Sequence, residues 1–319
     1  MAGRRVPRIT VKAFAKINLT LRVLGVRTDG YHDLRTTFQS VALHDTLTFR
    51  SARGAFGIEC DDPGCPTDRT NLVWRAAEAV WRAAGRRGRP TDVQVRIVKR
   101  IPLQAGLGGG SSDAAAAIRG LAALWHVELA PARLRAIAQT LGADVPFFLE
   151  GGAALGLDRG DLLFPLADAP TAWVTLVIPT FGVSTREAYS WWDSTPGPRV
   201  QTGRARPVRA TSAGARGAPT ERRQAGPEVI SGLPADELRN DLEPAVTARH
   251  PEIAEFVRAL RRCGARHAAM SGSGSATFGV FDSRIAAEKT ASVVTGRGYR
   301  VLITRTLGRA AYRAGTRPR

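Results

Sequence analysis

A run of glycine and serine residues between positions 106 and 112 has the composition of a phosphate-binding loop. The run reads Gly106-Leu107-Gly108-Gly109-Gly110-Ser111-Ser112 and opens an alanine-rich segment that extends to Trp125. Glycines allow backbone N–H groups to approach an anion closely, and the N-terminal end of a following helix adds a positive partial charge. The run could also be only a tight turn in which Ser112 caps the helix. A phosphate site is therefore the chemical interpretation of this loop, and a plain turn is the structural alternative.

Three common nucleotide-binding patterns do not describe this loop. A Walker A loop requires a lysine directly after its last glycine, and the chain has no lysine between Lys99 and Lys289. A dinucleotide fingerprint requires a strand that ends at the first glycine, whereas seven residues separate Val98 from Gly106. The HRD and DFG sequences of protein kinases are absent. If the loop binds a phosphate, it belongs to another class of site.

Lys16 and Asn18 lie on one face of a predicted strand. Apolar residues alternate with mostly polar ones from Ile9 to Leu24, which is the period of an amphipathic strand. That period places Lys16 and Asn18 next to each other on the face opposite the apolar residues. The pair is either part of a functional site or an ordinary solvated pair on the strand.

Three further positions could contribute polar groups to a site. Asp144 follows Gly142, where a predicted helix ends, and its structural alternative is a capping or turn-forming role. Tyr31 and His32 stand in a glycine-containing turn, which is usually plain surface structure. A second glycine-serine loop at 271–275 leads into a predicted strand and could be a simple connection between strands.

The surrounding elements indicate an α+β fold. Strands are predicted at 9–24, 37–49, 93–98, 173–178, 277–281 and 299–304, and helices at 71–84, from the glycine loop to 125, and at 131–141, 251–263 and 284–295. These elements are mixed without a regular βαβ repeat, and the length of 319 residues favours two domains. The segment 194–232 is rich in Pro, Gly, Arg, Ser and Thr, so we expect it to be a disordered insertion.

The net charge of +18 is concentrated in three parts of the chain. The segments 1–8, 193–235 and 305–319 carry 12 of these positive charges. This charge raises nucleic-acid binding as an alternative function class, but the aromatic residues do not interleave with the arginine clusters. We therefore expect no specific nucleic-acid partner.

The composition points to the cytoplasm. No apolar run approaches the roughly 18 residues of a membrane span, and the basic N-terminal segment has no apolar core behind it. The three cysteines, Cys60, Cys65 and Cys263, are an odd number without a histidine at ligand spacing. Neither a disulfide framework nor a zinc site is expected, and we predict a cytoplasmic protein without a membrane partner.

The chain resembles the superfamily of galacto-, homoserine, mevalonate and phosphomevalonate kinases in three segments: Ala15-Lys16-Ile17-Asn18-Leu19, the stretch from Pro102 to Ser112, and Ser271-Gly272-Ser273-Gly274. It is similar to the branch that phosphorylates diphosphocytidyl methylerythritol, in the non-mevalonate isoprenoid pathway, at Gly30-Tyr31-His32, Gly142-Ala143-Asp144-Val145-Pro146-Phe147 and Asn240-Asp241-Leu242-Glu243. The match covers about residues 11 to 282 and departs from the family at 194–232.

This resemblance implies a two-domain small-molecule kinase with a ferredoxin-like C-terminal domain and an active site between the domains. The ATP-binding domain would span 1–165 and the substrate-side domain 166–319. The implied reaction is phosphorylation of the 2-hydroxyl of the diphosphocytidyl substrate by ATP with Mg²⁺. A sibling kinase that acts on mevalonate or homoserine is the nearest alternative.

The resemblance also implies roles for individual residues. Asp144 would accept the proton of the attacking hydroxyl, while Lys16 would hold that carboxylate and the developing phosphoryl charge. The implied ATP-binding residues are Asn71 and Lys99 near the adenosine, with Pro102, Gly106, Leu107, Gly108, Gly109, Gly110, Ser111 and Ser112 around the phosphates. The implied substrate-binding residues are Asn18, Tyr31, His32, Phe181, Thr185, Gly272, Ser273 and Gly274. No ligand of Mg²⁺ is assigned, because the helix after the loop has no acid between Asp113 and Glu128.

Overall fold

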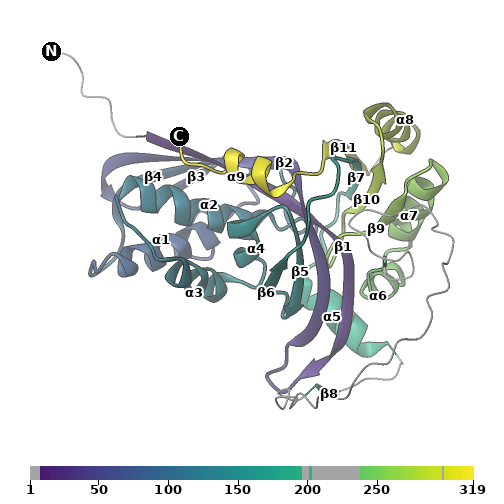
Figure 1. The fold of residues 1–319 in the computed structure, drawn as a ribbon, viewed down its shortest axis with the longest axis horizontal. Helices are drawn as coiled ribbons and strands as arrows, with labels where there is room; N and C mark the ends of the chain where they lie inside the picture. The colour runs from purple at the N-terminus through teal and green to yellow at the C-terminus, as the bar shows by residue number, and fades with distance from the viewer. Residues whose placement is uncertain (1–7, 196–200, 203–237, 297) are drawn as a thin grey trace, which may run out of the picture.

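The computed structural model describes residues 8–195, 201–202, 238–296 and 298–319. Over these residues the chain combines helices with a seven-stranded and a four-stranded sheet, which confirms the α+β class (Figure 1). The predicted strands and helices are present, and several extend further than expected. The disordered insertion predicted at 194–232 lies mostly outside the described residues.

A long antiparallel hairpin runs through the centre of the molecule. Its strands are β1 (Arg8–Arg27) and β2 (His32–Ala55), and β-bulges interrupt their pairing. Every residue of β1 from Ala13 to Leu21 is buried, because both faces of the strand are covered. The other strands of this sheet are β3 (Gly57–Cys60), β4 (Thr91–Val98), β5 (Ala153–Asp158), β6 (Leu162–Pro165) and β8 (Gln201–Thr202). The strand order is β3-β4-β2-β1-β8, and β5 pairs with β2 and with β6.

Four helices cover one face of this large sheet (Figure 1). They are α1 (Leu72–Ala83), α2 (Gly109–Leu124), α3 (Pro131–Leu141) and α4 (Val145–Glu150). Helix α2 can approach the hairpin closely because most of its buried residues are small, being alanine, glycine or serine. At Gly120 an added Cβ atom would come within 2.2 Å of the Phe49 ring, so only glycine fits at this crossing. Small residues thus hold α2, and the glycine loop before it, against the hairpin.

The four-stranded sheet has the strand order of a ferredoxin-like domain. Its order is β11-β7-β10-β9, with β7 (Trp173–Pro179), β9 (His267–Met270), β10 (Thr277–Phe281) and β11 (Tyr299–Arg305). One face packs against α7 (Pro251–Arg262) and α8 (Arg284–Val294), and the other packs against Ala15, Ile17 and Leu19 of β1. Strand β1 therefore belongs to both cores and joins them, and the small sheet has the ferredoxin-like order expected for the C-terminal half.

Three shorter helices complete the described chain. Helices α5 (Thr185–Ser194) and α6 (Glu243–Thr247) pack against each other, and α9 (Arg309–Gly315) returns to β1 of the large sheet (Figure 1). Tyr312 of α9 is buried against Phe14 of β1. The domain division at residue 165 stays a prediction. None of the helices in the described part of the chain is both long and apolar enough to cross a membrane.

Candidate active site

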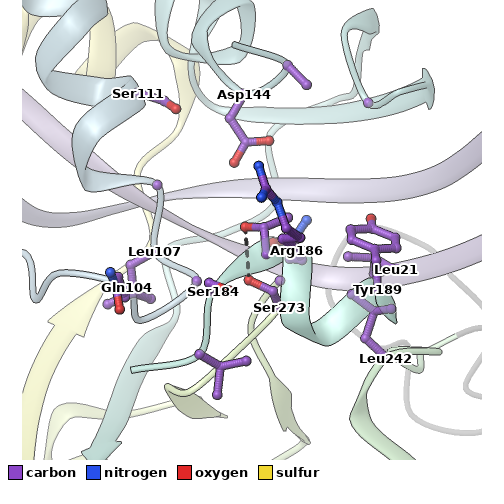
Figure 2. A pocket seen from close by; sticks show the side chains of 18 of the residues that line it. Leu21, Gln104, Leu107, Ser111, Asp144, Ser184, Arg186, Tyr189, Leu242 and Ser273 are labelled. Carbon is purple, nitrogen blue, oxygen red and sulfur yellow. Dashed lines mark hydrogen bonds between the residues drawn. The ribbon is translucent and has the colours of Figure 1, made fainter. Parts of the chain in front are cut away.

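A cavity of about 890 Å³ lies where β1, the glycine loop before α2, the loop at 271–275 and the first turns of α4 and α5 meet (Figure 2). Most residues that the sequence implicates line it. These are Lys16, Asn18, Tyr31, His32, Pro102, Gly106, Leu107, Gly108, Gly109, Gly110, Ser111, Asp144, Thr185, Gly272 and Ser273. Segments that are far apart in the sequence are thus brought to a single cavity.

Lys16 and Asn18 are buried in the wall of this cavity, with exposed fractions of 4% and 2%. Their period-two spacing places them side by side as predicted, but they are not solvated. The Lys16 ammonium donates hydrogen bonds to Asn18 Oδ1 at 2.5 Å and to the Gly106 carbonyl oxygen at 2.9 Å. Asn18 in turn donates to Thr36 Oγ1 at 2.7 Å, so the position of its amide is fixed.

Asp144 faces Lys16 from the start of α4. Its Oδ2 atom lies 3.5 Å from Lys16 Nζ, and its side chain is 32% exposed. The side chain makes no capping hydrogen bond to α4, which argues against the capping alternative. Burial lowers the pKa of Lys16, while the charge of Asp144 opposes that shift. The result is a carboxylate that is open to the cavity and held by a buried ammonium.

The glycine loop presents the start of α2 to the cavity. Gly108 is the N-cap residue with φ 72°, and the first bond of the helix runs from the Ser112 N–H to the Gly108 carbonyl. The N–H groups of residues 109–111 therefore precede the hydrogen-bonded part of the helix, as an anion site requires. Pocket lining and this geometry favour the phosphate-site interpretation over a plain turn.

The two glycine loops pack directly against each other. Gly106 has φ 72°, and an added Cβ atom would come within 2.0 Å of the Ser271 carbonyl oxygen. Ser271 Oγ donates to the Gly106 carbonyl at 3.0 Å and accepts from the Asn18 N–H at 3.3 Å. The loop at 271–275 therefore supports the glycine loop at 106–112 and β1, and it is more than a connection between strands.

The opposite end of the cavity is aromatic. His32 stacks on Tyr189 of α5 with ring centroids 4.5 Å apart, and its Nε2 atom lies 3.0 Å from Asp193 Oδ1. Tyr31 is 57% exposed, with Arg159 over its ring at 5.3 Å. Burial, with a smaller effect from the charge of Asp144, raises the pKa of Tyr189. The aromatic rings and polar atoms of Tyr31, His32 and Tyr189 at this end suit a flat polar group.

Five implicated residues do not line the cavity: Asn71, Lys99, Ser112, Phe181 and Gly274. Asn71 caps α1 by accepting a hydrogen bond from the Val73 N–H at 2.9 Å. Ser112 donates to the Phe14 carbonyl at 2.7 Å, and Phe181 stacks on His250 at 4.3 Å. The side chains of Asn71, Ser112 and Phe181 are thus occupied by contacts within the fold.

Lys99 is enclosed beneath the glycine loop. Its ammonium lies 2.6 Å from Asp45 Oδ2 and 2.8 Å from Asp113 Oδ2, and all three residues are buried. Burial acts to lower the pKa of Lys99, but the charges of Asp113 and Asp45 outweigh it and raise the pKa. Burial raises the pKa of Asp113 against the charge of Lys99. The cluster anchors the first turn of α2 and does not face the cavity.

Helix α5 contributes Arg186, Tyr189 and Asp193 to the cavity, and the sequence analysis assigned none of them. A signal for this helix was present. Ser184 and Glu187 form a capping box, in which Ser184 Oγ accepts from the Glu187 N–H at 3.2 Å and the Glu187 carboxylate accepts from the Ser184 N–H at 3.1 Å. The pattern Ser-x-x-Glu is typical of a helix start and would have identified α5.

The chain is similar to known kinases along nearly its whole length. Models of the GHMP kinases N terminal domain and of the GHMP kinases C terminal match residues 71–152 and 231–300. The 4-diphosphocytidyl-2-C-methyl-D-erythritol kinase of Moorella thermoacetica is 42% identical over 301 residues, which are 94% of this chain and 99% of that protein.

Solved structures agree with this similarity. A crystal structure of a 4-(cytidine 5'-diphospho)-2C-methyl-D-erythritol kinase superimposes with a TM-score of 0.71 at 34% identity, covering 94% of this chain and 99% of that one. The mevalonate kinase of Methanococcus jannaschii has a TM-score of 0.64 at only 11% identity, covering 96% and 100%, so it shares the fold alone. On the strength of the near full-length relatives, the chain belongs to the 4-diphosphocytidyl-2-C-methyl-D-erythritol kinase family of GHMP kinases.

Proposed function

We propose that the protein transfers the γ-phosphoryl group of ATP to the 2-hydroxyl of 4-diphosphocytidyl-2-C-methyl-D-erythritol. One observation carries this proposal: a carboxylate, Asp144, lies 3.5 Å from a buried ammonium, Lys16, in the cavity that also contains the glycine loop. A general base, a fixed positive charge and an anion site within one cavity are the parts that phosphoryl transfer requires.

Asp144 acts as the general base in this reaction. The substrate hydroxyl oxygen forms a bond to the γ-phosphorus while the bond from that phosphorus to the β,γ-bridging oxygen breaks, and ADP leaves. The hydroxyl proton passes to the Asp144 carboxylate. Lys16 holds that carboxylate in place, because its own position is fixed by Asn18 and Gly106.

The glycine loop binds the phosphates of ATP through the free N–H groups at the start of α2. The side chains that line the cavity at the start of α2 include one oxygen donor, the Ser111 hydroxyl, which fits a Mg²⁺ ion held mainly by phosphate oxygens. The described residues contain no group of three or more His, Cys, Asp or Glu side chains that would hold a metal by themselves. Such an ion, when bound, neutralises charge on the phosphates.

The aromatic end of the cavity binds the cytidine part of the substrate. Tyr31 is exposed there, and His32 and Tyr189, which stack on each other, line the same part of the cavity. Stacking on an aromatic ring is worth about 1 to 3 kcal/mol per base. The location is proposed to be the cytoplasm, where ATP is available.

A coupled assay for ADP release tests the proposed function. ADP should form rapidly with the diphosphocytidyl substrate, and slowly with unmodified methylerythritol, mevalonate or homoserine at the same concentration. Equal rates with unmodified methylerythritol would show that the cytidine end of the cavity is wrongly assigned. Preferential turnover of mevalonate or homoserine would replace the proposal with a sibling activity.

A further inference from the structure

Most of the donor capacity of Lys16 is already used within the protein. An ammonium has three N–H donors, and Lys16 uses two of them in hydrogen bonds to Asn18 Oδ1 and the Gly106 carbonyl. Asp144 pairs with the same ammonium at 3.5 Å. A phosphoryl group in transfer carries charge on three equatorial oxygens, and that charge must be met by preorganised donors. A cationic side chain with free donors, acting beside Mg²⁺ and the N–H groups of α2, would meet part of this charge.

Arg186 is the cation that the structure offers. It lines the cavity, and Figure 2 shows its side chain extending from α5 toward Asp144. It is exposed and has no hydrogen bond or ion pair with any residue that the structure describes. The other arginine in the cavity wall, Arg159, already binds Asp161 at 2.9 Å near the Tyr31 end. Arg186 thus has its full set of five N–H donors free.

The first turn of α5, which carries Arg186, is fixed in position relative to both glycine loops. The capping box of Ser184 and Glu187 fixes this turn. Thr185 Oγ1 lies 3.3 Å from Ser273 Oγ, and the Val183 N–H donates to the Gln104 carbonyl at 3.2 Å. The guanidinium is therefore carried on a turn that is tied to the phosphate loop on one side and to the loop at 271–275 on the other.

We propose that Arg186 is a catalytic residue that binds the γ-phosphoryl group during its transfer; this rests on the proposed kinase function. Its planar fork donates to two equatorial oxygens of that group. Arg186 takes up no proton: the new oxygen–phosphorus bond forms, the bond to the ADP oxygen breaks, and the hydroxyl proton goes to Asp144. Lys16 is then a positioning residue for Asp144, and Arg186 stabilises the negative charge on the phosphoryl oxygens.

Steady-state kinetics of the full chain with Arg186→Gln, Arg186→Lys and Arg186→Ala test this proposal. Arg186→Gln should lower kcat by about 10² to 10³ fold, the usual loss for one preorganised charge-stabilising donor, and change KM for ATP by less than about threefold. Arg186→Lys should recover only part of kcat, because an ammonium lacks the bidentate fork. Added guanidinium at low concentration should raise kcat of Arg186→Ala and leave the wild type unchanged. Arg135→Gln, at an exposed position on α3, is the matched control.

Two outcomes would overturn the assignment. An unchanged kcat would remove Arg186 from the reacting centre, and an unchanged kcat with a raised KM for the cytidine substrate would place it on the substrate diphosphate instead. Because Arg186 is exposed, melting temperatures should match the wild type, and a melted variant would show a structural role. If the wild-type protein fails to phosphorylate the diphosphocytidyl substrate, the proposed function fails irrespective of the variants.

Discussion

At the scale of single residues, the site depends on the Asp144 carboxylate, which the Lys16 ammonium holds in place. We expect Asp144→Asn to lower kcat by about 10² to 10⁴ fold, the usual range for a positioned general base, with little change in ATP affinity. Rapid-quench or coupled assays measure the first quantity, and nucleotide titration measures the second. Turnover close to that of the wild type would exclude Asp144 as the base.

His267 is a buried titratable residue outside the cavity. Its Nε2 atom lies 2.9 Å from the Leu19 carbonyl oxygen, so the neutral ring donates from Nε2. Burial lowers the pKa of His267 to about 4, and the charge of Arg261 acts in the same direction. The unfolded chain binds a proton below its ordinary pKa of about 6.5, whereas the folded protein does not until about 4. Stability should therefore fall as the pH decreases through this window.

Urea unfolding at several pH values measures this contribution. Between pH 7 and pH 4 the wild type should lose on the order of 3 kcal/mol more than His267→Gln, since one unit of pKa difference corresponds to about 1.4 kcal/mol. Glutamine is the matched replacement because its amide can still donate to the Leu19 carbonyl. Parallel pH profiles for the two proteins would mean that His267 titrates normally in the fold.

At the scale of secondary-structure elements, α2 is anchored by the buried cluster of Lys99, Asp45 and Asp113. Oδ1 of Asp113 has no hydrogen-bond partner among the described residues, so the cluster depends on the lysine charge. Lys99→Met should lower the free energy of unfolding by about 3 to 5 kcal/mol, because it leaves two uncompensated buried carboxylates. ATP affinity of the folded variant should stay within about threefold of the wild type.

Lys12→Met is the control for this variant, since Lys12 is an exposed lysine on β1. Its unfolding free energy should be close to that of the wild type. A Lys99→Met protein with normal stability and weak ATP binding would instead support the nucleotide contact that the family resemblance implies.

The sequence predicted which residues share a face better than it predicted what covers that face. The alternation from Ile9 to Leu24 correctly paired Lys16 with Asn18, but period two is the same for a solvated face and for a face buried in a cavity wall. Likewise, the family resemblance implied that Lys99 lies near the adenosine, and it did not reveal that Asp45 would pair with this lysine from β2. Long-range partners of this kind are set by tertiary packing, which local patterns do not encode.

At the scale of the whole molecule, the C-terminal helix α9 closes the large sheet. The Tyr312 ring lies 5.5 Å from Phe14, and its hydroxyl donates to the Phe148 carbonyl of α4 at 2.7 Å. Tyr312→Phe should lower the free energy of unfolding by about 1 kcal/mol, the worth of one hydrogen bond, and Tyr312→Ala by about 3 to 5 kcal/mol, the cost of a buried aromatic cavity. Chemical denaturation distinguishes the two losses, and a small loss for both would show that α9 packs only loosely.

The contact between Tyr312 and Phe14 also has a consequence for synthesis of the chain on the ribosome. Phe14 emerges early, and the ring that covers it is added almost 300 residues later, at about 5 to 20 residues per second. The central hairpin must therefore remain partly uncovered while most of the polypeptide is translated. Contact between Phe14 and Tyr312 closes a long loop of the chain, and this closure is slow compared with local helix formation. Nascent chains arrested before residue 312 should accordingly bind chaperones through β1.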